Sequence, residues 1–393
     1  MEASAVSLAG SRSSVRAQTL AAPWPIFSVL FASACVIIGV MWDISWHTTI
    51  GRDTFWTPAH MAIYLGGIVA GLACGWLALH TTFAGTPEER AQGVRFWRFF
   101  TAPLGAWVCI WGTFAMLTSA PFDDWWHNAY GLDVKILSPP HTVLALGIGA
   151  IQLGALLMTL ARQNRAVEEG AARARYDRLY AVAAGLIFLN STIMTSEFAY
   201  RVLMHSPRFY EVTCGVFTFY LVTLARAARL RWPTTTIAAV YTGVVIAMVW
   251  ILPLFPAESR LGPIYQPVTH MVPPDFPLLV IAPAVVMDLI FQRYGERFGG
   301  WRLAALLGAA FFVVFLAVQW NFAEFLNSPY SQNWVFATNN YFYGLPKNTY
   351  MYRHLFRPSP PMLPWRWLIP LALAIVAARL GLAVGGWFRR VQR

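Results

Sequence analysis

Residues 24–42, WPIFSVLFASACVIIGVMW, form an apolar run without a charged side chain. A helix of about 20 such residues spans the hydrocarbon core of a bilayer. Similar runs recur along the chain, which is 57% hydrophobic and 12% charged and has a mean hydropathy of +0.50. Soluble globular domains carry about twice that share of charged residues. The sequence therefore predicts an integral membrane protein in contact with the lipid bilayer.

We predict an all-α, polytopic membrane bundle of about ten transmembrane helices. The apolar runs cover residues 24–42, 59–80, 101–119, 141–161, 179–195, 212–230, 235–254, 277–292, 302–320 and 366–387. Arginines gather at both termini and after the second, fourth, sixth and eighth runs. The positive-inside rule assigns these segments, and hence the N- and C-termini, to the cytoplasm. This placement accounts for the net charge of +11, so we expect no nucleic-acid partner.

Histidines concentrate on the opposite side of this predicted topology. The outer loops are then residues 43–58, 120–140, 196–211, 255–276 and 321–365. Seven of the eight histidines lie in or beside these loops, namely His47, His60, His127, His141, His205, His270 and His354. Such a distribution indicates that the outer face uses imidazole groups.

The first outer segment carries an acid and two histidines at informative spacings. Asp43 precedes His47 by four residues, and His60 follows thirteen residues after His47. Residues at i and i+4 share one face of a helix. Thr57 and Pro58 then stop this segment and start a new helix with His60 in its first turn. One carboxylate and two imidazoles are thus predicted to form a three-ligand metal site.

The second outer segment repeats the pattern. Asp123 precedes His127 by four residues, and His141 follows fourteen residues after His127. The SPP sequence at 138–140 takes the place of the TP sequence before the last histidine. Ionisable groups at membrane depth cost free energy, so two matched sets favour metal binding over simple solvation. We therefore predict a second metal site at Asp123, His127 and His141.

Other polar and aromatic residues nearby have weaker claims to ligate metal. Arg52 and Asp53 are expected to form an ion pair that shapes the turn. Asp124 would either accept a hydrogen bond from a ligand imidazole or replace its neighbour as a ligand, and the sequence leaves both roles open. The tryptophans are better explained as an aromatic belt at the lipid headgroups. They are Trp42, Trp46, Trp56, Trp125 and Trp126.

The stretch WHTTIGRDTFWTPAH, residues 46–60, resembles the metal-binding stretch of the C-type membrane subunit of the copper membrane monooxygenases, the particulate methane and ammonia monooxygenases. The stretch FDDWWHNAYGLDVKILSPPH, residues 122–141, is similar to that family's second ligand set. The family has Asn where Asp123 stands here, so the chain keeps an oxygen ligand and adds a negative charge. The likeness covers about residues 40–65 and 119–145, which leaves more than half of the chain without a counterpart.

This resemblance implies a copper-binding oxygenase, or an oxygenase subunit, that oxidises a small substrate such as a hydrocarbon or ammonia with O2. It implies a bacterial inner membrane location with the metal sites on the periplasmic side, and an oligomer with other membrane subunits. The family also works with a cupredoxin-type subunit. No predicted outer loop has the length of a cupredoxin domain, so a partner would supply that part or the additional spans would replace it.

Three alternatives remain open at the level of sequence. Two imidazoles and one carboxylate also suit non-haem iron and zinc. The chain is alternatively a non-catalytic, metal-holding or structural subunit of a larger membrane complex. A transporter is less favoured, because its ionisable groups would lie near the midplane, whereas the charged residues here lie mostly at the span ends.

The predicted spans and sites suggest three parts of the chain. Residues 1–22 form a cytoplasmic tail, residues 23–161 a four-helix metal-binding membrane core, and residues 162–393 six further transmembrane helices. The last part contains a long outer loop, 321–365, rich in aromatic and amide residues. Long connections are uncommon without a role, so we expect this loop to pack over the outer face as a lid or a subunit interface.

Overall fold

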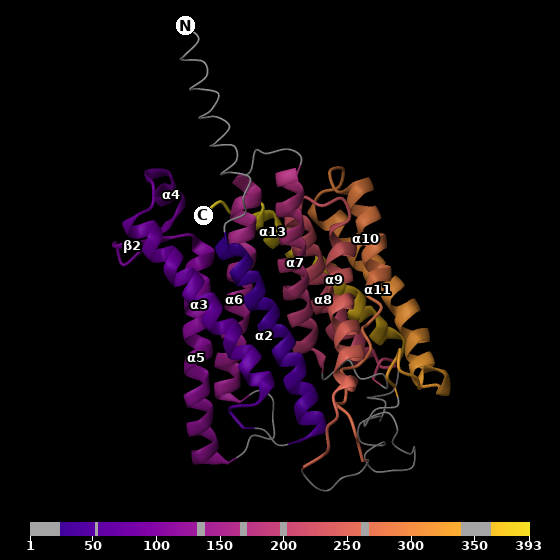
Figure 1. The fold of residues 1–393 in the computed structure, drawn as a ribbon. Coiled ribbons are helices and arrows are strands. Elements are labelled where there is room, and N and C mark those ends of the chain that lie inside the picture. The colour runs from indigo at the N-terminus through magenta and orange to yellow at the C-terminus, as the bar shows by residue number, and fades with distance from the viewer. Residues whose placement is uncertain are drawn as a thin grey trace. The chain divides into compact units, whose positions relative to one another are not determined.

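The computed structural model describes residues 24–51, 54–131, 138–165, 171–196, 203–260, 267–338 and 363–393. Most of these residues are helical (Figure 1). The α-helices are α2 (Trp24–Thr49), α3 (Pro58–Phe83), α4 (Pro87–Gln92), α5 (Leu104–Tyr130), α6 (Pro139–Arg165), α7 (Ala171–Met194), α8 (Pro207–Ala227), α9 (Pro233–Ile251), α10 (Ile281–Tyr294), α11 (Gly300–Leu326) and α13 (Leu368–Phe388). The remaining elements are the strands β1 (Val94–Phe96) and β2 (Phe100–Ala102) and the 3-10 turns η2 (Leu252–Leu254), η3 (Pro329–Ser331) and η4 (Pro364–Trp367).

Each of the ten apolar runs overlaps one α-helix, although the run 101–119 begins in β2 and the run 277–292 begins before α10. Within the part of the chain that the structure describes, seven helices are long and apolar enough to cross a membrane, namely α2, α3, α5, α6, α9 with η2, α11, and α13 with η4. Among the others, α10 has only 14 residues, and the first half of α7 is rich in arginine. Length and composition thus describe a multi-pass membrane protein. The total of ten spans and the cytoplasmic side of the termini stay predictions.

Several helices extend beyond the ends of their apolar runs. Residues 43–49 belong to α2 and residues 120–130 to α5, so the prediction that these residues are loops was wrong. The apolar runs end before the helices do, because the last turns of these helices carry acids and histidines. Residues 321–326 likewise extend α11. Most of the long outer loop, residues 339–362, lies outside the described residues, so its predicted packing stays a prediction.

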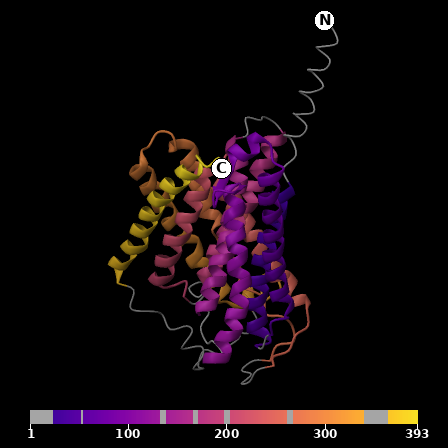
Figure 2. The same ribbon diagram turned by 90° about the vertical axis from the view of Figure 1, so that its left-hand side faces the viewer.

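The chain divides into two compact units, and each is described by itself. Unit 1 comprises Met1–Ala32, Gly67–Ala183 and Val391–Arg393, and unit 2 comprises Ser33–Gly66 and Ala184–Arg390. In unit 1, the long helices α5 and α6 run side by side in both views (Figures 1 and 2). The domain boundary expected after residue 161 stays a prediction.

Glycines let the backbones of α5 and α6 touch in unit 1. A Cβ atom on Gly154 would lie 2.6 Å from the carbonyl oxygen of Gly105, and one on Gly112 would lie 2.8 Å from the carbonyl oxygen of Gly147. Small residues at such crossings allow close helix packing in membranes. The order of these contacts makes the two helices antiparallel. The end of α5 therefore lies beside the start of α6, where the second predicted metal set is found.

In unit 2 the helices α8, α11 and α13 pack together in the same manner. A Cβ atom on Gly308 of α11 would lie 2.6 Å from the backbone nitrogen of Ile375, and one on Gly381 would lie 2.9 Å from the carbonyl oxygen of Phe219. The aromatic rings of Phe209, Tyr210 and Phe315 fill the space near these helices and are fully buried. Close backbone contacts and buried rings thus both contribute to the packing of this helix group.

A buried carboxylate joins α9 to α10 in unit 2. Asp288 of α10 has no exposed surface, and its two oxygens accept hydrogen bonds from the backbone nitrogens of Thr234 and Thr235, at 3.0 and 2.8 Å. These nitrogens belong to the first turn of α9, where backbone N–H groups have no acceptor within their own helix. The Thr234 hydroxyl donates to the carbonyl oxygen of Ala284, at 2.7 Å. Asp288 therefore caps α9 from a neighbouring helix.

Replacing Asp288 by alanine is expected to destabilise the fold by about 1–2 kcal/mol, because it removes the acceptor for one buried and one partly buried backbone donor. The thermal unfolding midpoint of the detergent-purified protein measures this effect. Asp288→Asn retains one oxygen acceptor and should lose less. An Asp288→Ala protein that unfolds at the same temperature as the unmodified chain would show that this cap is not needed.

Candidate metal centre

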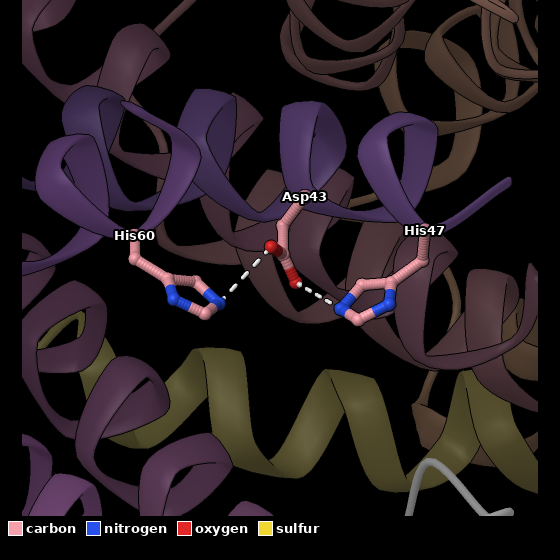
Figure 3. A group of neighbouring side chains, drawn as sticks. All are labelled: Asp43, His47 and His60. Atoms are coloured by element: carbon pink, nitrogen blue, oxygen red, sulfur yellow. Dashed lines mark ion pairs between the residues drawn. The ribbon is translucent and has the colours of Figure 1, made fainter. Parts of the chain in front are cut away.

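The first predicted set comes together between the last turns of α2 and the first turn of α3, all within unit 2. Figure 3 shows the Asp43 carboxylate between the two imidazole rings. Its Oδ1 lies 3.1 Å from Nε2 of His60, and its Oδ2 lies 3.7 Å from Nε2 of His47. One candidate ligand atom from each residue lies within 4.8 Å of the other two. The structure therefore brings all three side chains to a common centre.

The ligand types and their spacing are compatible with a transition-metal ion. Bonds of about 2.0–2.2 Å to nitrogen and oxygen place neighbouring ligand atoms about 3.3 Å apart in a tetrahedral site. The two carboxylate–imidazole distances bracket that value. Asp43 Oδ1 is also buried, and its 3.1 Å contact with His60 Nε2 lacks regular hydrogen-bond geometry. A bound cation would give this oxygen a further partner.

The three side chains differ in their exposure to solvent. The side chains of Asp43 and His60 are each 23% exposed, whereas His47 is 50% exposed. An ion held here would thus rest against the bundle on one side and be open on the side of His47. Three protein ligands with an open position are typical of catalytic rather than structural metal sites.

A close contact between α2 and α3 sets the distance across this centre. A Cβ atom on Gly39 would lie 2.9 Å from the backbone nitrogen of Ile63 and 3.1 Å from the carbonyl oxygen of Ala59. Gly39 lies one helical turn before Asp43, and Ala59 is adjacent to His60. The absence of a side chain at Gly39 therefore lets the two helices approach closely enough for Asp43 to reach His60.

The end of α2 is held by a segment from much later in the chain. Ser45 donates its hydroxyl to the carbonyl oxygen of Val272, at 2.5 Å, and Thr49 accepts a hydrogen bond from the Val272 nitrogen, at 2.8 Å. The Ser259 hydroxyl donates to the carbonyl oxygen of Thr49, at 2.9 Å, and the Arg260 nitrogen to that of Ile50, at 3.0 Å. The bonds from Ser259 and Arg260 satisfy carbonyls at the helix end that have no partner within the helix. They fix the turn that carries His47.

A cavity of about 180 Å³ borders the opposite face of the same stretch of α2, within unit 2. Met41, Ile44 and Thr48 line it, and they are offset along the helix from Asp43 and His47. Asp275 and Phe276 contribute to its other walls. The helix itself therefore separates the cavity from the candidate metal centre.

The second predicted set comes together in unit 1, between the end of α5 and the start of α6. Asp123 Oδ2 lies 3.3 Å from Nε2 of His127, and Oδ1 lies 3.6 Å from Nε2 of His141. Asp123 Oδ1 is buried and accepts no hydrogen bond. The His127 Nδ1 atom lies 3.3 Å from the carbonyl oxygen of Gly131. This contact fixes which ring nitrogen faces the carboxylate.

The two sets share local structure but differ in how tightly they converge. His60 donates its backbone N–H to the Thr57 hydroxyl and His141 donates to the Ser138 hydroxyl, each at 3.3 Å. In each case a hydroxyl caps the helix, a proline follows, and the histidine occupies the first turn. Among the described residues, the limit of 4.8 Å between all three ligand atoms is met by the first set and not by the second. The second set is therefore wider.

The three residues expected to support the sites have different outcomes. Asp124 is exposed, and its carboxylate accepts a hydrogen bond of 3.4 Å from Asn128 on the next turn of α5. Arg52 and Asp53 lie outside the described residues, so their predicted ion pair stays a prediction. Sequence reasoning did not identify Gly39 or Val272 as parts of the site. Gly39 could have been found from its position one helical turn before Asp43. No local sequence pattern marks Val272.

Replacing Gly39 by valine is expected to destabilise the protein by about 1–3 kcal/mol, because the new side chain would overlap Ile63 and force the helices apart. Gly75→Val in α3 is the matched control, since a Cβ atom at Gly75 meets no atom within 4 Å. Thermal unfolding of both variants in detergent checks this difference. Equal loss of stability in the two variants would mean that the close contact at Gly39 does not hold α2 and α3 together.

No family model matches the chain, and no curated protein or solved structure matches it either. The likeness to the C-type membrane subunit of the particulate methane and ammonia monooxygenases therefore rests on the two motifs. The geometry adds that both motifs fold into a carboxylate placed between two imidazoles. Membership of that family stays a proposal.

Proposed function

We propose that this chain is a copper-binding integral membrane protein that acts as an oxygenase or an oxygenase subunit. Its substrate would be a small molecule such as a hydrocarbon or ammonia, oxidised with O2. The convergence of Asp43, His47 and His60 carries the proposal, together with the motif around these residues. A second copper site is proposed at Asp123, His127 and His141, whose ligand atoms lie farther apart than those of the first set.

The protein groups would position the metal rather than react with it. The Asp43 carboxylate presents one oxygen to each imidazole, so metal binding would replace those contacts without large movement of the backbone. A bound copper ion would supply the activation of O2, and imidazole is a suitable ligand for copper. The half-exposed ring of His47 marks the side from which a small molecule can approach. The apolar helices on the other side would limit access of water.

The metal and the catalytic role each have an alternative. The same ligand types bind non-haem iron or zinc, which is why element-specific measurements are required. The chain would alternatively be a metal-holding or structural subunit without catalysis. That role is consistent with the wider second set and with the need for a cupredoxin-type partner that the resemblance implies.

The cellular setting is part of the proposal. Alternating arginine-rich segments support cytoplasmic termini and a position of both metal sets on the outer side of a bacterial inner membrane. Other membrane subunits, and an oligomeric assembly, follow from the resemblance.

The protein purified from membranes without chelator is expected to contain copper. X-ray absorption at the copper, iron and zinc edges would identify the element, and mass spectrometry would give its amount per chain. His60→Ala should lose at least about tenfold in metal affinity, because one of three ligands is removed. His80→Ala is the matched control, since His80 stacks on Trp76 at the far end of α3. Absence of copper, or full metal retention by His60→Ala, would refute the metal assignment.

Catalysis is tested separately by substrate-dependent oxygen uptake in the metal-loaded protein and its copurifying chains. An oxygenase should consume O2 when a small hydrocarbon or ammonia and an electron donor are added, and Asp43→Asn should reduce this rate. A copper-loaded preparation that copurifies with partner chains but shows no uptake would support the non-catalytic alternative.

A further inference from the structure

The segment between α3 and α5 forms a small structured element at the ends of two candidate membrane spans, all within unit 1. After α3 ends at Phe83, the chain forms α4 and the β1–β2 hairpin before α5 begins at Leu104. Figure 1 draws this element beside the ends of both helices, and Figure 2 views unit 1 from its side. Because both helices are long and apolar enough to span a membrane, their connection lies where the bilayer surface meets water.

Two bonds tie the hairpin to the spans. The Thr101 backbone nitrogen donates to the Thr82 hydroxyl, at 2.9 Å, which links β2 to the last turn of α3. The Trp107 indole nitrogen donates to the carbonyl oxygen of Val94, at 3.0 Å, which links β1 to the first turn of α5. The hairpin therefore has a fixed position relative to the helix ends and is not a free loop.

Large aromatic side chains are exposed at the hairpin tip. Trp97 is 78% exposed and Phe99 is 60% exposed. Phe83 at the end of α3 is 62% exposed, and its ring centroid lies 5.8 Å from that of Phe99. The Trp97 ring instead lies 4.8 Å from that of Phe96, so the aromatic patch consists of exposed rings in two separate contacts, on a segment that follows a candidate membrane span. Exposed apolar patches of this kind mark interaction surfaces.

The backbone of the tip is unfavourable for the residues it carries. The Phe99 nitrogen donates to the carbonyl oxygen of Phe96, at 3.2 Å, and closes a turn around Trp97 and Arg98. These two residues have φ angles of 50° and 62°, the left-handed region that a type I′ turn requires. Asn-Gly is the favoured pair there, and bulky residues are strained. Trp97 and Arg98 therefore occupy turn positions that disfavour their backbone conformation, and both side chains are exposed.

The aromatic patch is accompanied by positive charge. Arg95 and Arg98 are exposed, and neither forms an ion pair with a residue that the structure describes. Glu89, an acid on α4, is engaged in the capping box with Thr86. An arginine beside a tryptophan at a membrane surface suits a phosphate group and the region just beneath it. The charge and the apolar patch thus match one occupant, an anionic phospholipid.

We propose that the tip formed by Trp97, Arg98 and Phe99, with Arg95, inserts into the headgroup layer and binds anionic phospholipid. The aromatic rings enter the boundary between headgroups and acyl chains, and the guanidinium groups bind the lipid phosphates. Because the hairpin is bonded to α3 and α5, this contact sets the depth of both helix ends in the bilayer. The proposal does not depend on the metal sites or on catalysis.

Hydroxyl-radical footprinting of the unmodified protein in lipid nanodiscs tests the insertion, because mass spectrometry locates oxidation at single residues. Nanodiscs of phosphatidylglycerol and of phosphatidylcholine are compared, with Tyr330, 83% exposed, as the reference. Oxidation of Trp97 relative to Tyr330 should fall by about fivefold in the anionic lipid, as expected for one arginine at an anionic surface. Equal oxidation in both lipids would overturn the proposal and indicate a water-facing tip available to a soluble partner.

A double variant separates lipid binding from folding of the hairpin. Trp97→Asn with Arg98→Gly installs the favoured pair for this turn, so the variant should unfold in lipid-free detergent at the same temperature as the unmodified chain or higher. Native mass spectrometry should show about fivefold less bound phosphatidylglycerol. Trp334→Asn, at another exposed tryptophan, is the control and should bind as before. Unchanged lipid binding by the double variant contradicts the proposal, and the footprinting decides the case of a variant that fails to fold.

Discussion

Close approach of paired helices near their ends is the constraint on which both candidate sites depend. A carboxylate and an imidazole at the edge of an apolar bundle lose hydration and are tolerated when they face one another. In unit 2 the contact of Gly39 with Ala59 and Ile63 lets Asp43 meet His60. In unit 1 the glycines of α5 and α6 bring the two helices into contact, and Asp123 lies near His141 where these helices end and begin. Apolar packing thus determines where the polar groups lie.

The two sites use one local arrangement in separate units. Each has an acid and a histidine on successive turns at the end of a helix, and a second histidine in the first turn of the next. A hydroxyl cap and a proline start that second helix in both. The arrangements are not equal, because the second set lacks the tight convergence of the first. Asp123, which replaces the asparagine of the resembling family, would add charge where the geometry is wider.

The sequence predicted a helix at each of the ten apolar runs and the grouping of one acid with two histidines in each motif, because these depend on local patterns. Apolar length predicts a helix, and i, i+4 spacing places Asp43 and His47 on one face. The extent of α2 and α5 was underestimated, since hydropathy does not distinguish a polar helical turn from a loop. Contacts between distant segments were missed. The cap that Asp288 provides to α9 and the hydrogen bonds of Val272 to α2 depend on the tertiary arrangement, which no short window of sequence contains.

The bond between Ser45 and Val272 joins residues that are 227 positions apart. During synthesis from the N-terminus, α2 and α3 are therefore made long before the segment that secures the end of α2. A ribosome-bound chain that stops short of Val272 already contains Asp43, His47 and His60 but lacks this support. The helix end that carries Asp43 and His47 therefore gains this support only after the chain has been made as far as Val272, which couples its order to a segment synthesised much later.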